Sequence, residues 1–207
     1  MEPKNVDIVD VKSVGEDTIT VDIETPPEFD ARPGQFIKLS VTAEGEHITR
    51  FYTLSSAFVN DTFEITVGID PDGTLGPWLT SATGQSVTIE GPYGSAFYED
   101  ESSVLILAGG PGIGPAIGIG ERVLADGGTV TILYQDVEPV HEERLEALKE
   151  NGATVHVTQD PLDDLIEGEY ADQQVFIYGF QTFVSDAVAA LETVGADADH
   201  AKIENFG

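Results

Sequence analysis

The hydrophobic period of the sequence changes near its middle, and this change limits the folds that the chain can adopt. In the first half apolar and polar residues alternate, which is the pattern of strands with one buried face. In the second half apolar residues form short continuous runs between helix-like segments, which is typical of parallel strands buried on both faces. The 207 residues are enough for two domains of ordinary size, one for each pattern.

The alternating half predicts an antiparallel six-stranded β-barrel. Clusters of Pro, Gly, Asn and Asp separate the alternating segments and mark the turns. Trp78 and Leu79 are expected to lie in one helical turn between the fifth and sixth strands. The predicted strands span residues 6–11, 18–23, 36–41, 48–54, 63–69 and 86–90.

The second half predicts an α/β domain with a doubly wound parallel sheet, because strands alternate with helices joined by right-handed crossovers. Acidic residues and serines interrupt both patterns at residues 97–103. We therefore expect one domain over residues 1–100 and the other over residues 101–207. The predicted strands span residues 104–107, 130–133, 155–157 and 175–178, and the helices span residues 115–125, 142–149 and 183–191.

The chain is strongly acidic, with 38 acidic and nine basic side chains and a net charge of −29. Such a surface repels itself in dilute buffer, and at 1 M salt the screening length falls to about 3 Å. We therefore hypothesise a halophilic source with molar salt in its cytoplasm, while an ordinary acidic protein is the alternative. Nucleic acids and anionic membranes are poor partners, because contact with phosphate needs Lys and Arg.

Residue types exclude or disfavour several kinds of site. The chain has no Cys, so it forms no disulfide, and any Cys-bound iron–sulfur cluster must belong to a partner. The four His residues show no metal-ligand spacing, and no metal site is predicted. No apolar run reaches about 18 residues, and the start lacks a signal-peptide pattern. We expect a cytoplasmic protein.

The run Arg50-Phe51-Tyr52-Thr53 in the fourth predicted strand is the main candidate site. Alternate side chains of a strand share a face, so Arg50 and Tyr52 point the same way and Thr53 lies on the other face or at a bend. A cation, a flat aromatic ring and a hydroxyl suit a ligand with a phosphate and a planar ring. The alternative is an amphipathic barrel strand with one exposed Arg.

Other short motifs follow in a fixed order. Residues 33–37 read Pro-Gly-Gln-Phe-Ile, residues 91–94 read Gly-Pro-Tyr-Gly, residues 108–115 read Ala-Gly-Gly-Pro-Gly-Ile-Gly-Pro, and residues 203–207 read Ile-Glu-Asn-Phe-Gly. In this order and spacing the motifs resemble those of the ferredoxin-NADP reductase superfamily over nearly the whole chain. The resemblance implies a flavin-binding barrel followed by a domain that binds a nicotinamide nucleotide.

The resemblance gives flavin-binding roles to the main candidate site. It implies that Arg50 binds the flavin phosphate and that Tyr52 stacks on the isoalloxazine ring. Thr53 is expected to form a hydrogen bond near the reactive ring nitrogen, and Ser56 stands where the family often has a second Ser. Tyr52 and Thr53 are the expected catalytic residues, and Thr53 would stabilise the flavin as its protonation changes.

A second segment resembles the family's helix start that meets the flavin pyrophosphate. The backbone N–H groups at a helix start suit an anion. Pro77 lacks an N–H, although Pro at a first helical position is common. A simple capped turn is the alternative, and we expect FAD rather than FMN. The residues concerned are Gly73, Thr74, Leu75 and Gly76.

Two more segments are expected near the flavin. Phe206 resembles a C-terminal aromatic residue that covers the flavin ring, with Glu204 close by, and a frayed terminus is the alternative. The segment containing Tyr93 resembles one that lies near the flavin and the domain junction. A tight turn that only closes the barrel is the alternative for Tyr93.

The glycine-rich motif follows a predicted buried strand and precedes a predicted helix, which is the setting of a dinucleotide-binding loop. Gly lets the backbone approach a pyrophosphate, and the helix N-terminus supplies positive partial charge. A purely structural strand-to-helix turn is the alternative. The predicted nucleotide-binding residues here are Gly109, Gly110, Gly112, Ile113 and Pro115.

Two departures from the family pattern affect the nucleotide half. Where the family often has Cys-Gly-Pro, this chain reads Tyr178-Gly179-Phe180, and we expect Tyr178 and Gly179 to take the same place. Asp136 follows the second predicted strand of this half, where NADP-specific members often have Arg or Ser. Its carboxylate would repel a 2′-phosphate and could accept from a ribose hydroxyl, which favours NADH over NADPH. The alternative is an ordinary solvated carboxylate.

The resemblance implies an NAD(P)H-dependent flavoprotein reductase that transfers electrons between NAD(P)H and a one-electron acceptor. A ferredoxin with a two-iron two-sulfur cluster, another iron–sulfur protein or an oxygenase component fits this role. A free-flavin reductase stays open as an alternative, as does a flavin-bearing electron-transfer or assembly subunit without nicotinamide turnover. The direction of electron flow and the oligomeric state are not predicted.

Overall fold

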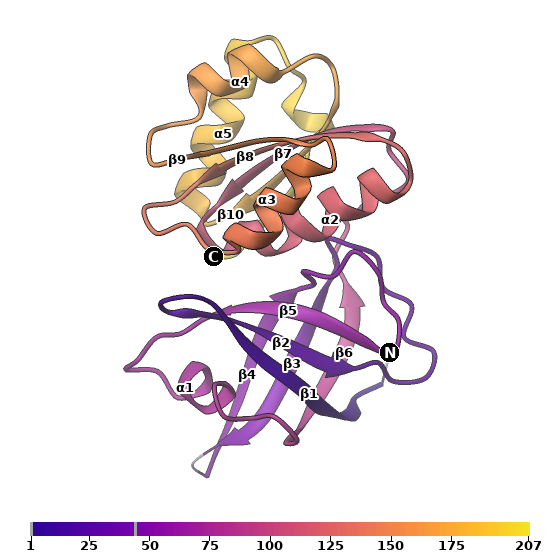
Figure 1. Cartoon of the computed structure of the whole chain (residues 1–207). Coiled ribbons are helices and arrows are strands. Elements are labelled where there is room, and N and C mark those ends of the chain that lie inside the picture. The colour runs from indigo at the N-terminus through magenta and orange to yellow at the C-terminus, as the bar shows by residue number, and fades with distance from the viewer. Residues whose placement is uncertain (1, 44) are drawn as a thin grey trace.

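The computed structural model describes residues 2–43 and 45–207. The first half of the chain forms a β-barrel, and the second half forms an α/β domain that is stacked on one end of it (Figure 1). The C-terminus lies at the boundary between these two parts (Figure 1). The predicted order of a barrel followed by an α/β domain is therefore confirmed.

The barrel is one six-stranded antiparallel sheet with the strand order β4-β3-β6-β1-β2-β5. All six predicted strands are confirmed, and several are longer than predicted because their hydrogen-bonded ladders continue past the alternating segments. For example, β6 continues to Tyr93, which pairs with Phe36. The strands are β1 (Lys4–Gly15), β2 (Thr18–Glu24), β3 (Phe36–Ala43), β4 (Glu46–Thr53), β5 (Thr62–Gly68) and β6 (Ser86–Tyr93).

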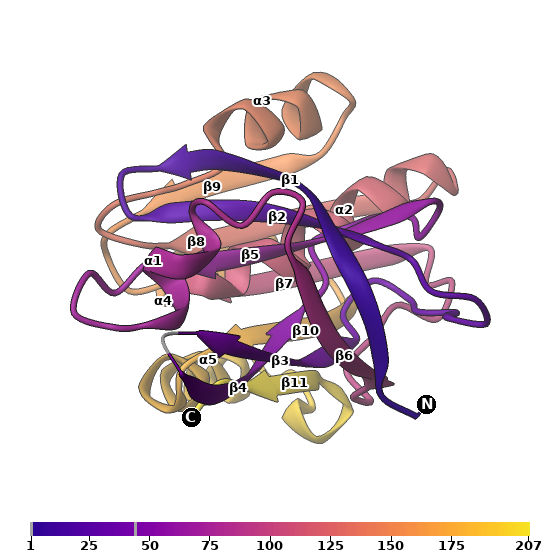
Figure 2. The same cartoon turned by 90° about the horizontal axis from the view of Figure 1, so that it is seen from below.

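The barrel core comes from the apolar positions of the alternating pattern, such as Ile23, Ile37 and Ile65, which are fully buried. Figure 2 looks along the barrel, with β1, β2 and β5 on one side and β3, β4 and β6 on the other. The edge strands β4 and β5 meet at an isolated bridge between Leu54 and Ile65. The short helix α1 (Leu75–Leu79), predicted from Trp78 and Leu79, packs on this core.

The α/β domain has a five-stranded parallel sheet with the order β11-β10-β7-β8-β9. The four predicted strands and three predicted helices of this half are confirmed. The strands are β7 (Ser103–Gly109), β8 (Thr129–Gln135), β9 (Thr154–Thr158), β10 (Gln174–Gly179) and β11 (Lys202–Asn205). The helices are α2 (Ile113–Ala125), α3 (Glu142–Glu150), α4 (Asp163–Glu169) and α5 (Gln181–Thr193), with short 3₁₀ turns η1 (Gly110–Gly112) and η2 (Ala198–His200).

The sequence patterns did not reveal β11 and α4. β11 has four residues, of which two are charged, and α4 has seven residues that begin with two aspartates. The helices cover both faces of the sheet: α2 and α3 pack on one face, and α4 and α5 on the other. Among the described helices, none is long and apolar enough to cross a membrane.

Helix α2 lies between the parallel sheet and the barrel (Figure 1). A Cβ atom at Gly114 would lie 3.1 Å from Thr66 Cβ of the barrel, and one at Gly118 would lie 3.0 Å from the carbonyl carbon of Ser55. These two glycines are one helical turn apart and share a face. They let α2 lie directly on the barrel backbone, which fixes one domain against the other.

Candidate functional site

A cavity of about 550 Å³ opens where the barrel meets the α/β domain. Sites for small molecules commonly have volumes of about 300–1,000 Å³ and lie at domain junctions. The barrel lines the cavity with Phe36, Phe51, Tyr52, Thr53, Thr66 and Gly68. The α/β domain lines it with Pro111, Pro115, Phe180, Glu204, Asn205 and Phe206.

Tyr52 and Arg50 lie on the same face of the edge strand β4, as the sequence predicted, because they pair with the core residues Ile37 and Leu39 of β3. Tyr52 is half-buried, and burial raises the pKa of its hydroxyl to about 12, so the phenol stays neutral. Arg50 is exposed outside the cavity lining, and its Nη1 donates to the Thr49 carbonyl at 2.8 Å. Arg50 forms no ion pair with any residue that the structure describes.

A hydrogen bond between Thr53 and Glu204 joins the two domains inside the cavity. Thr53 Oγ1 donates to Glu204 Oε1 at 2.8 Å. The other carboxyl oxygen, Glu204 Oε2, is buried and has no partner among the described residues. Burial raises the pKa of Glu204 to about 7, although the bond from Thr53 acts in the opposite direction. A carboxyl group of this kind exchanges its proton near neutral pH.

Phe206 and Phe180 form an aromatic wall of the cavity. Their rings meet edge to face, with centroids 6.2 Å apart. The backbone N–H of Phe206 donates to the Gly179 carbonyl at 2.9 Å, so the residue continues beyond β11 in a fixed position. This arrangement contradicts the alternative of a frayed terminus, and Phe206 lines the cavity.

The glycine-rich segment divides into residues that face the cavity and residues that are needed for packing. Pro111 and Pro115 line the cavity, and Gly110 has a positive φ of 53° that suits glycine. A Cβ at Gly112 would overlap the Tyr178 carbonyl oxygen, so this glycine allows close contact between α2 and the sheet. Ile113 is fully buried. Only the backbone of Ile113 can therefore take part in the predicted nucleotide site.

Gly109 has the same packing role as Gly112. A Cβ at Gly109 would overlap the ring of Phe183, and one at Gly179 would lie 2.7 Å from the same ring. Both glycines are fully buried in the sheet. Only their backbone can take part in a site. These glycines are needed because α5 packs closely on β7 and β10.

Asp136 lies beside the glycine-rich segment. A Cβ at Gly110 would lie 4.0 Å from Asp136 Oδ2. The carboxylate accepts a hydrogen bond from the Tyr134 hydroxyl at 2.9 Å and from the Glu138 backbone N–H at 3.0 Å. Burial and the adjacent Asp136 raise the pKa of Tyr134. Asp136 is thus held in place rather than freely solvated, with its negative charge directed to the end of the sheet where Gly110 lies.

The side chain of Tyr178 is not among those that line the cavity, so only its backbone can take part in the predicted nucleotide site. Tyr178 is fully buried, and its hydroxyl donates to the Ala96 carbonyl. The phenol is longer than the expected Cys and fills the space between β10 and the chain that leaves the barrel. Phe180, two residues later, lines the cavity instead.

Two predicted flavin contacts in the barrel lie away from the cavity lining. Ser56 Oγ accepts the backbone N–H of Glu64 and so connects the two edge strands. In the second segment Leu75 is buried in the barrel core, and Thr74 gives no side-chain cap to α1. None of Gly73, Thr74, Leu75 and Gly76 is among the residues that line the described cavity.

Sequence reasoning missed the polar contacts that cross the domain junction behind the cavity. Arg144 of α3 donates to Glu121 of α2 at 2.8 Å, to Glu64 of β5 at 2.7 Å and to the Ser55 carbonyl at 2.8 Å. His141 Nε2 lies 2.9 Å from Thr66 Oγ1. The scarcity of basic residues was the signal that could have revealed these contacts. In so acidic a chain an Arg is expected to form ion pairs with nearby carboxylates.

Comparison with known proteins agrees with this geometry. Residues 5–98 match the family described as the oxidoreductase FAD-binding domain. The chain is 31% identical to the ferredoxin reductase component of 3-ketosteroid-9-alpha-monooxygenase from Mycobacterium tuberculosis, over 89% of this chain and 58% of that protein. It is 26% identical to the glycine betaine monooxygenase reductase subunit of Chromohalobacter salexigens, over the same shares of the two chains.

A solved ferredoxin NADP+ reductase from Neisseria gonorrhoeae with bound FAD and NADP has the same fold. The two structures superpose with a TM-score of 0.81 and 19% sequence identity, over 100% of both chains. The chain belongs to the ferredoxin-NADP reductase superfamily and carries an oxidoreductase FAD-binding domain. It spans 58% of the length of the curated relatives it matches.

Proposed function

We propose that the chain is an NAD(P)H-dependent flavoprotein reductase that passes electrons to a one-electron acceptor. The observation that carries this proposal is the Thr53–Glu204 hydrogen bond, which joins the two domains inside a cavity that both of them line. A proton-exchanging carboxyl group beside an aromatic wall suits electron and proton transfer between two flat ring systems. The FAD-binding family of the barrel supports the same reading.

The residues present fit FAD. The face of the half-buried Tyr52 ring is available at the cavity for stacking on an isoalloxazine ring. Arg50 lies two residues before it on the same strand face and forms no ion pair with described residues, and its planar fork suits a phosphate. The orphaned Glu204 Oε2 can bond to a polar edge of the bound ring or to water. Bound flavin would supply the ability to take a hydride and release electrons singly.

The chain's own residues would then orient the flavin ring and bind, release and relay a proton. Tyr52 fixes the ring plane and, with its pKa near 12, contributes no charge. Glu204 holds a proton below about pH 7 and releases it above that value. Thr53 Oγ1 is bonded to this carboxyl group and both residues line the cavity, so Thr53 can relay the proton by exchanging its hydrogen-bond partners.

A nicotinamide nucleotide would enter from the carboxyl end of the parallel sheet, where ligands bind in α/β folds. Gly110, Pro111 and Pro115 lie there, and Phe206 stands where the nicotinamide ring would have to stack. The fixed carboxylate of Asp136 beside Gly110 disfavours a 2′-phosphate. We therefore propose NADH as the preferred donor.

The proposed acceptor is a two-iron two-sulfur ferredoxin, another iron–sulfur protein or an oxygenase component. The printed names of the relatives describe reductase subunits of monooxygenases, which supports this class. The absence of Cys from the chain requires that a Cys-ligated cluster be supplied from outside these 207 residues. We also propose a halophilic cytoplasm as its setting, on the basis of the net charge of −29.

The test is to purify the protein in molar KCl, identify any flavin that it retains, and measure turnover with NADH and NADPH. Reduction of a two-iron two-sulfur ferredoxin by NADH with retained FAD is the expected result. Turnover only with added free flavin would identify a free-flavin reductase instead. Retained FAD without oxidation of either nucleotide would favour an electron-transfer or assembly subunit and contradict the proposal.

A further inference from the structure

The carboxyl group of Glu204 is carried into the cavity by β11, a short strand at the edge of the sheet. β11 has four residues and, among the described strands, pairs with β10 alone, with Lys202 opposite Phe176 and Glu204 opposite Tyr178. Short edge strands have few hydrogen bonds and open locally at low free-energy cost. The position of Glu204 therefore depends on what holds the ends of β11.

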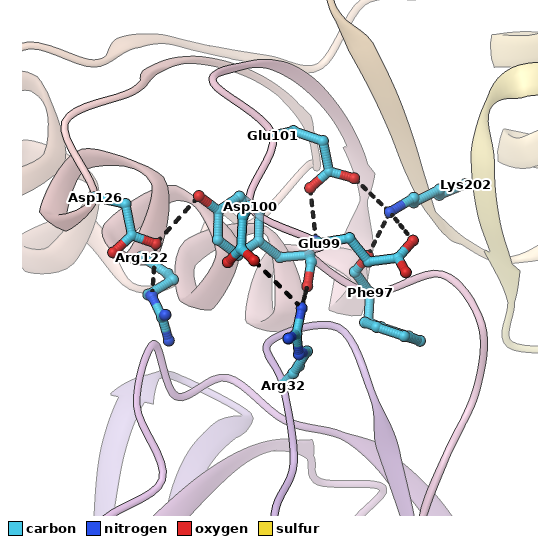
Figure 3. A network of polar contacts seen from close by, with 9 residues as sticks. Arg32, Phe97, Glu99, Asp100, Glu101, Arg122, Asp126 and Lys202 are labelled. Atoms are coloured by element: carbon cyan, nitrogen blue, oxygen red, sulfur yellow. Dashed lines mark hydrogen bonds and ion pairs between the residues drawn. The ribbon is translucent and has the colours of Figure 1, made fainter.

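Lys202 holds the beginning of β11. Its Nζ donates to the Phe97 carbonyl at 2.8 Å, to Glu99 Oε2 at 2.9 Å and to the Glu101 carboxylate (Figure 3). These bonds use all three ammonium donors. The side chain is only 16% exposed, and that of Glu101 is 17% exposed. Such an ion pair is costly to break on one side, because a half-buried charge is then left without its partner.

Aromatic contacts add to this anchor. Lys202 Nζ lies 5.8 Å from the ring centroid of Phe97 and 5.2 Å from that of Phe176, within the range of cation–π attraction. Lys202 and Glu204 alternate along β11 and so share one face of the sheet. On the neighbouring strand Tyr178 shares this face and binds the Ala96 carbonyl. The face that carries Glu204 is therefore fastened to residues 96–101.

The segment that Lys202 contacts, residues 97–101, is itself bonded to both domains (Figure 3). Arg32 of the barrel donates to the Tyr98 carbonyl at 3.4 Å and lies 3.8 Å from the Asp100 carboxylate. The Tyr98 hydroxyl donates to Asp126 at 3.2 Å, and Arg122 of α2 bonds the same carboxylate at 2.8 Å. Lys202 thus ties β11 to a segment whose place relative to the barrel, and so to Thr53, is set.

We propose that Lys202 is a positioning residue that sets the distance between Glu204 and Thr53. It does so by holding the first residue of β11 against residues 97–101, so that Glu204, two residues later, meets the barrel at the cavity. Three of the nine basic residues of this acidic chain, Arg32, Arg122 and Lys202, are used at this segment. Any effect of Lys202 on the turnover of NAD(P)H rests on the proposed function. The effect of Lys202 on the position of Glu204 does not.

Loss of Lys202 has a defined effect on Glu204. The groups that face or flank this carboxyl group are Thr53 on β4, Tyr178 on β10 and Lys202 itself on β11, with Glu101 nearby in the connecting segment. Without the ammonium group, Glu101 loses its ion pair and keeps only the bond from the Glu99 backbone N–H, its carboxylate is repelled by that of Glu99, and the start of β11 loosens. Water then reaches Glu204, and its proton affinity falls towards that of an exposed glutamate.

The experiment compares Lys202→Met with Lys149→Met, since Lys149 forms an exposed ion pair with Glu146 on α3, away from the cavity. The carboxyl group of Glu204 is followed by ¹³C NMR in the purified protein as it is isolated, with Glu204→Gln to assign the signal. We expect titration near 7 in the wild type and in Lys149→Met, and a shift towards the ordinary value of 4.5 in Lys202→Met. Lys202→Arg, which keeps the charge, should restore most of the wild-type value.

A purely structural role for Lys202 makes a different prediction. Lys202→Met would then lower the thermal midpoint and leave the Glu204 titration where it is, and this result would overturn the proposal. If Lys202→Met does not fold, Glu101→Gln replaces it, because it removes one anchor and should shift the titration in the same direction by less. The variants could show the expected shifts in the Glu204 titration while the wild type oxidises neither NADH nor NADPH. That result would count against the proposed function alone.

Discussion

His141 Nε2 of the α/β domain lies 2.9 Å from Thr66 Oγ1 of the barrel, so a histidine of one domain forms a hydrogen bond with a residue that lines the cavity from the other. His141 is only 3% exposed, and its Nδ1 has no partner among the described residues. Burial, with a smaller effect of the Arg144 charge, lowers the pKa of His141 to about 4. The junction thus depends on a neutral imidazole.

The first prediction concerns the loss of folding stability at acidic pH. The folded pKa of His141, about 4, lies below its ordinary value of 6.5, so the unfolded chain binds the proton first as the pH falls. The stability that follows from a neutral His141 is present above pH 6.5 and lost between there and pH 4, by roughly 3 kcal/mol in total. Denaturant unfolding of His141→Gln, which keeps a hydrogen-bonding group but does not titrate, should show a weaker decline over this range. An equal decline in both proteins would contradict the role of His141.

The second prediction has the opposite sign. The folded pKa of Glu204, about 7, lies above its ordinary value of 4.5, so its contribution to stability is present below pH 4.5 and lost as the pH rises through 7. Glu204→Gln should therefore be more stable than the wild type at pH 8, by up to about 3 kcal/mol, with little difference at pH 4.5. Urea unfolding at the two pH values measures this. Equal stabilities at pH 8 would show that Glu204 is not buried as a costly charge.

The third prediction concerns the close contact of α2 with the barrel. Gly118→Ala places a Cβ atom 3.0 Å from the carbonyl carbon of Ser55, where backbone must shift, and should lower the free energy of unfolding by about 1–3 kcal/mol. Gly168→Ala of α4 is the matched control, since nothing lies within 4 Å of its Cβ position. The control should be neutral or stabilising by up to about 1 kcal/mol, as is usual for Gly to Ala in a helix.

The fourth prediction concerns the choice of nucleotide. Asp136→Ser removes a fixed negative charge beside Gly110. We expect kcat/KM for NADPH to rise relative to NADH on the order of tenfold, which corresponds to about 1.4 kcal/mol. Asp199→Ser, the same change at an exposed carboxylate in η2, which precedes β11 at the opposite end of the sheet, is the control and should leave the ratio unchanged. An unchanged ratio in Asp136→Ser would place the adenosine end elsewhere.

The fifth prediction concerns salt. With a net charge of −29 the thermal midpoint should rise steadily from low to molar KCl, because screening removes the repulsion between carboxylates. Sorbitol of equal osmolarity is the control for effects that do not depend on charge. A midpoint that is flat or falls with KCl would contradict the halophilic setting.

The sequence was sufficient for elements whose pattern is long and regular. The alternation of β1 to β6 and the apolar runs of β7 and β10 arise directly from burial on one or two faces of a sheet. β11 could not be found in this way, because two of its four residues are exposed and the other two only half buried, and its place depends on pairing with β10 and on Lys202. A four-residue strand held by distant contacts leaves no periodic signal.

The candidate site was predicted in part for the same reason. The strand period predicts that Tyr52 shares a face with Arg50, but it puts the adjacent Thr53 on the opposite face or at a bend. Both residues line the cavity, and β4 ends at Thr53. The buried position of the Tyr178 side chain was not predicted, because a motif position does not show how a larger side chain will pack against Ala96. The Thr53–Glu204 bond spans 151 residues of sequence, and only the stacking of the two domains brings these groups together.

The central claim is that the cavity between the domains brings a nicotinamide and a flavin into contact. An anaerobic absorbance titration of the purified protein, with its flavin bound, against NADH in molar KCl tests it most directly. The flavin bands are expected to bleach on addition of NADH, with a weaker response to NADPH. Bound flavin that keeps its absorbance at saturating NADH and NADPH, yet bleaches with dithionite, would contradict it.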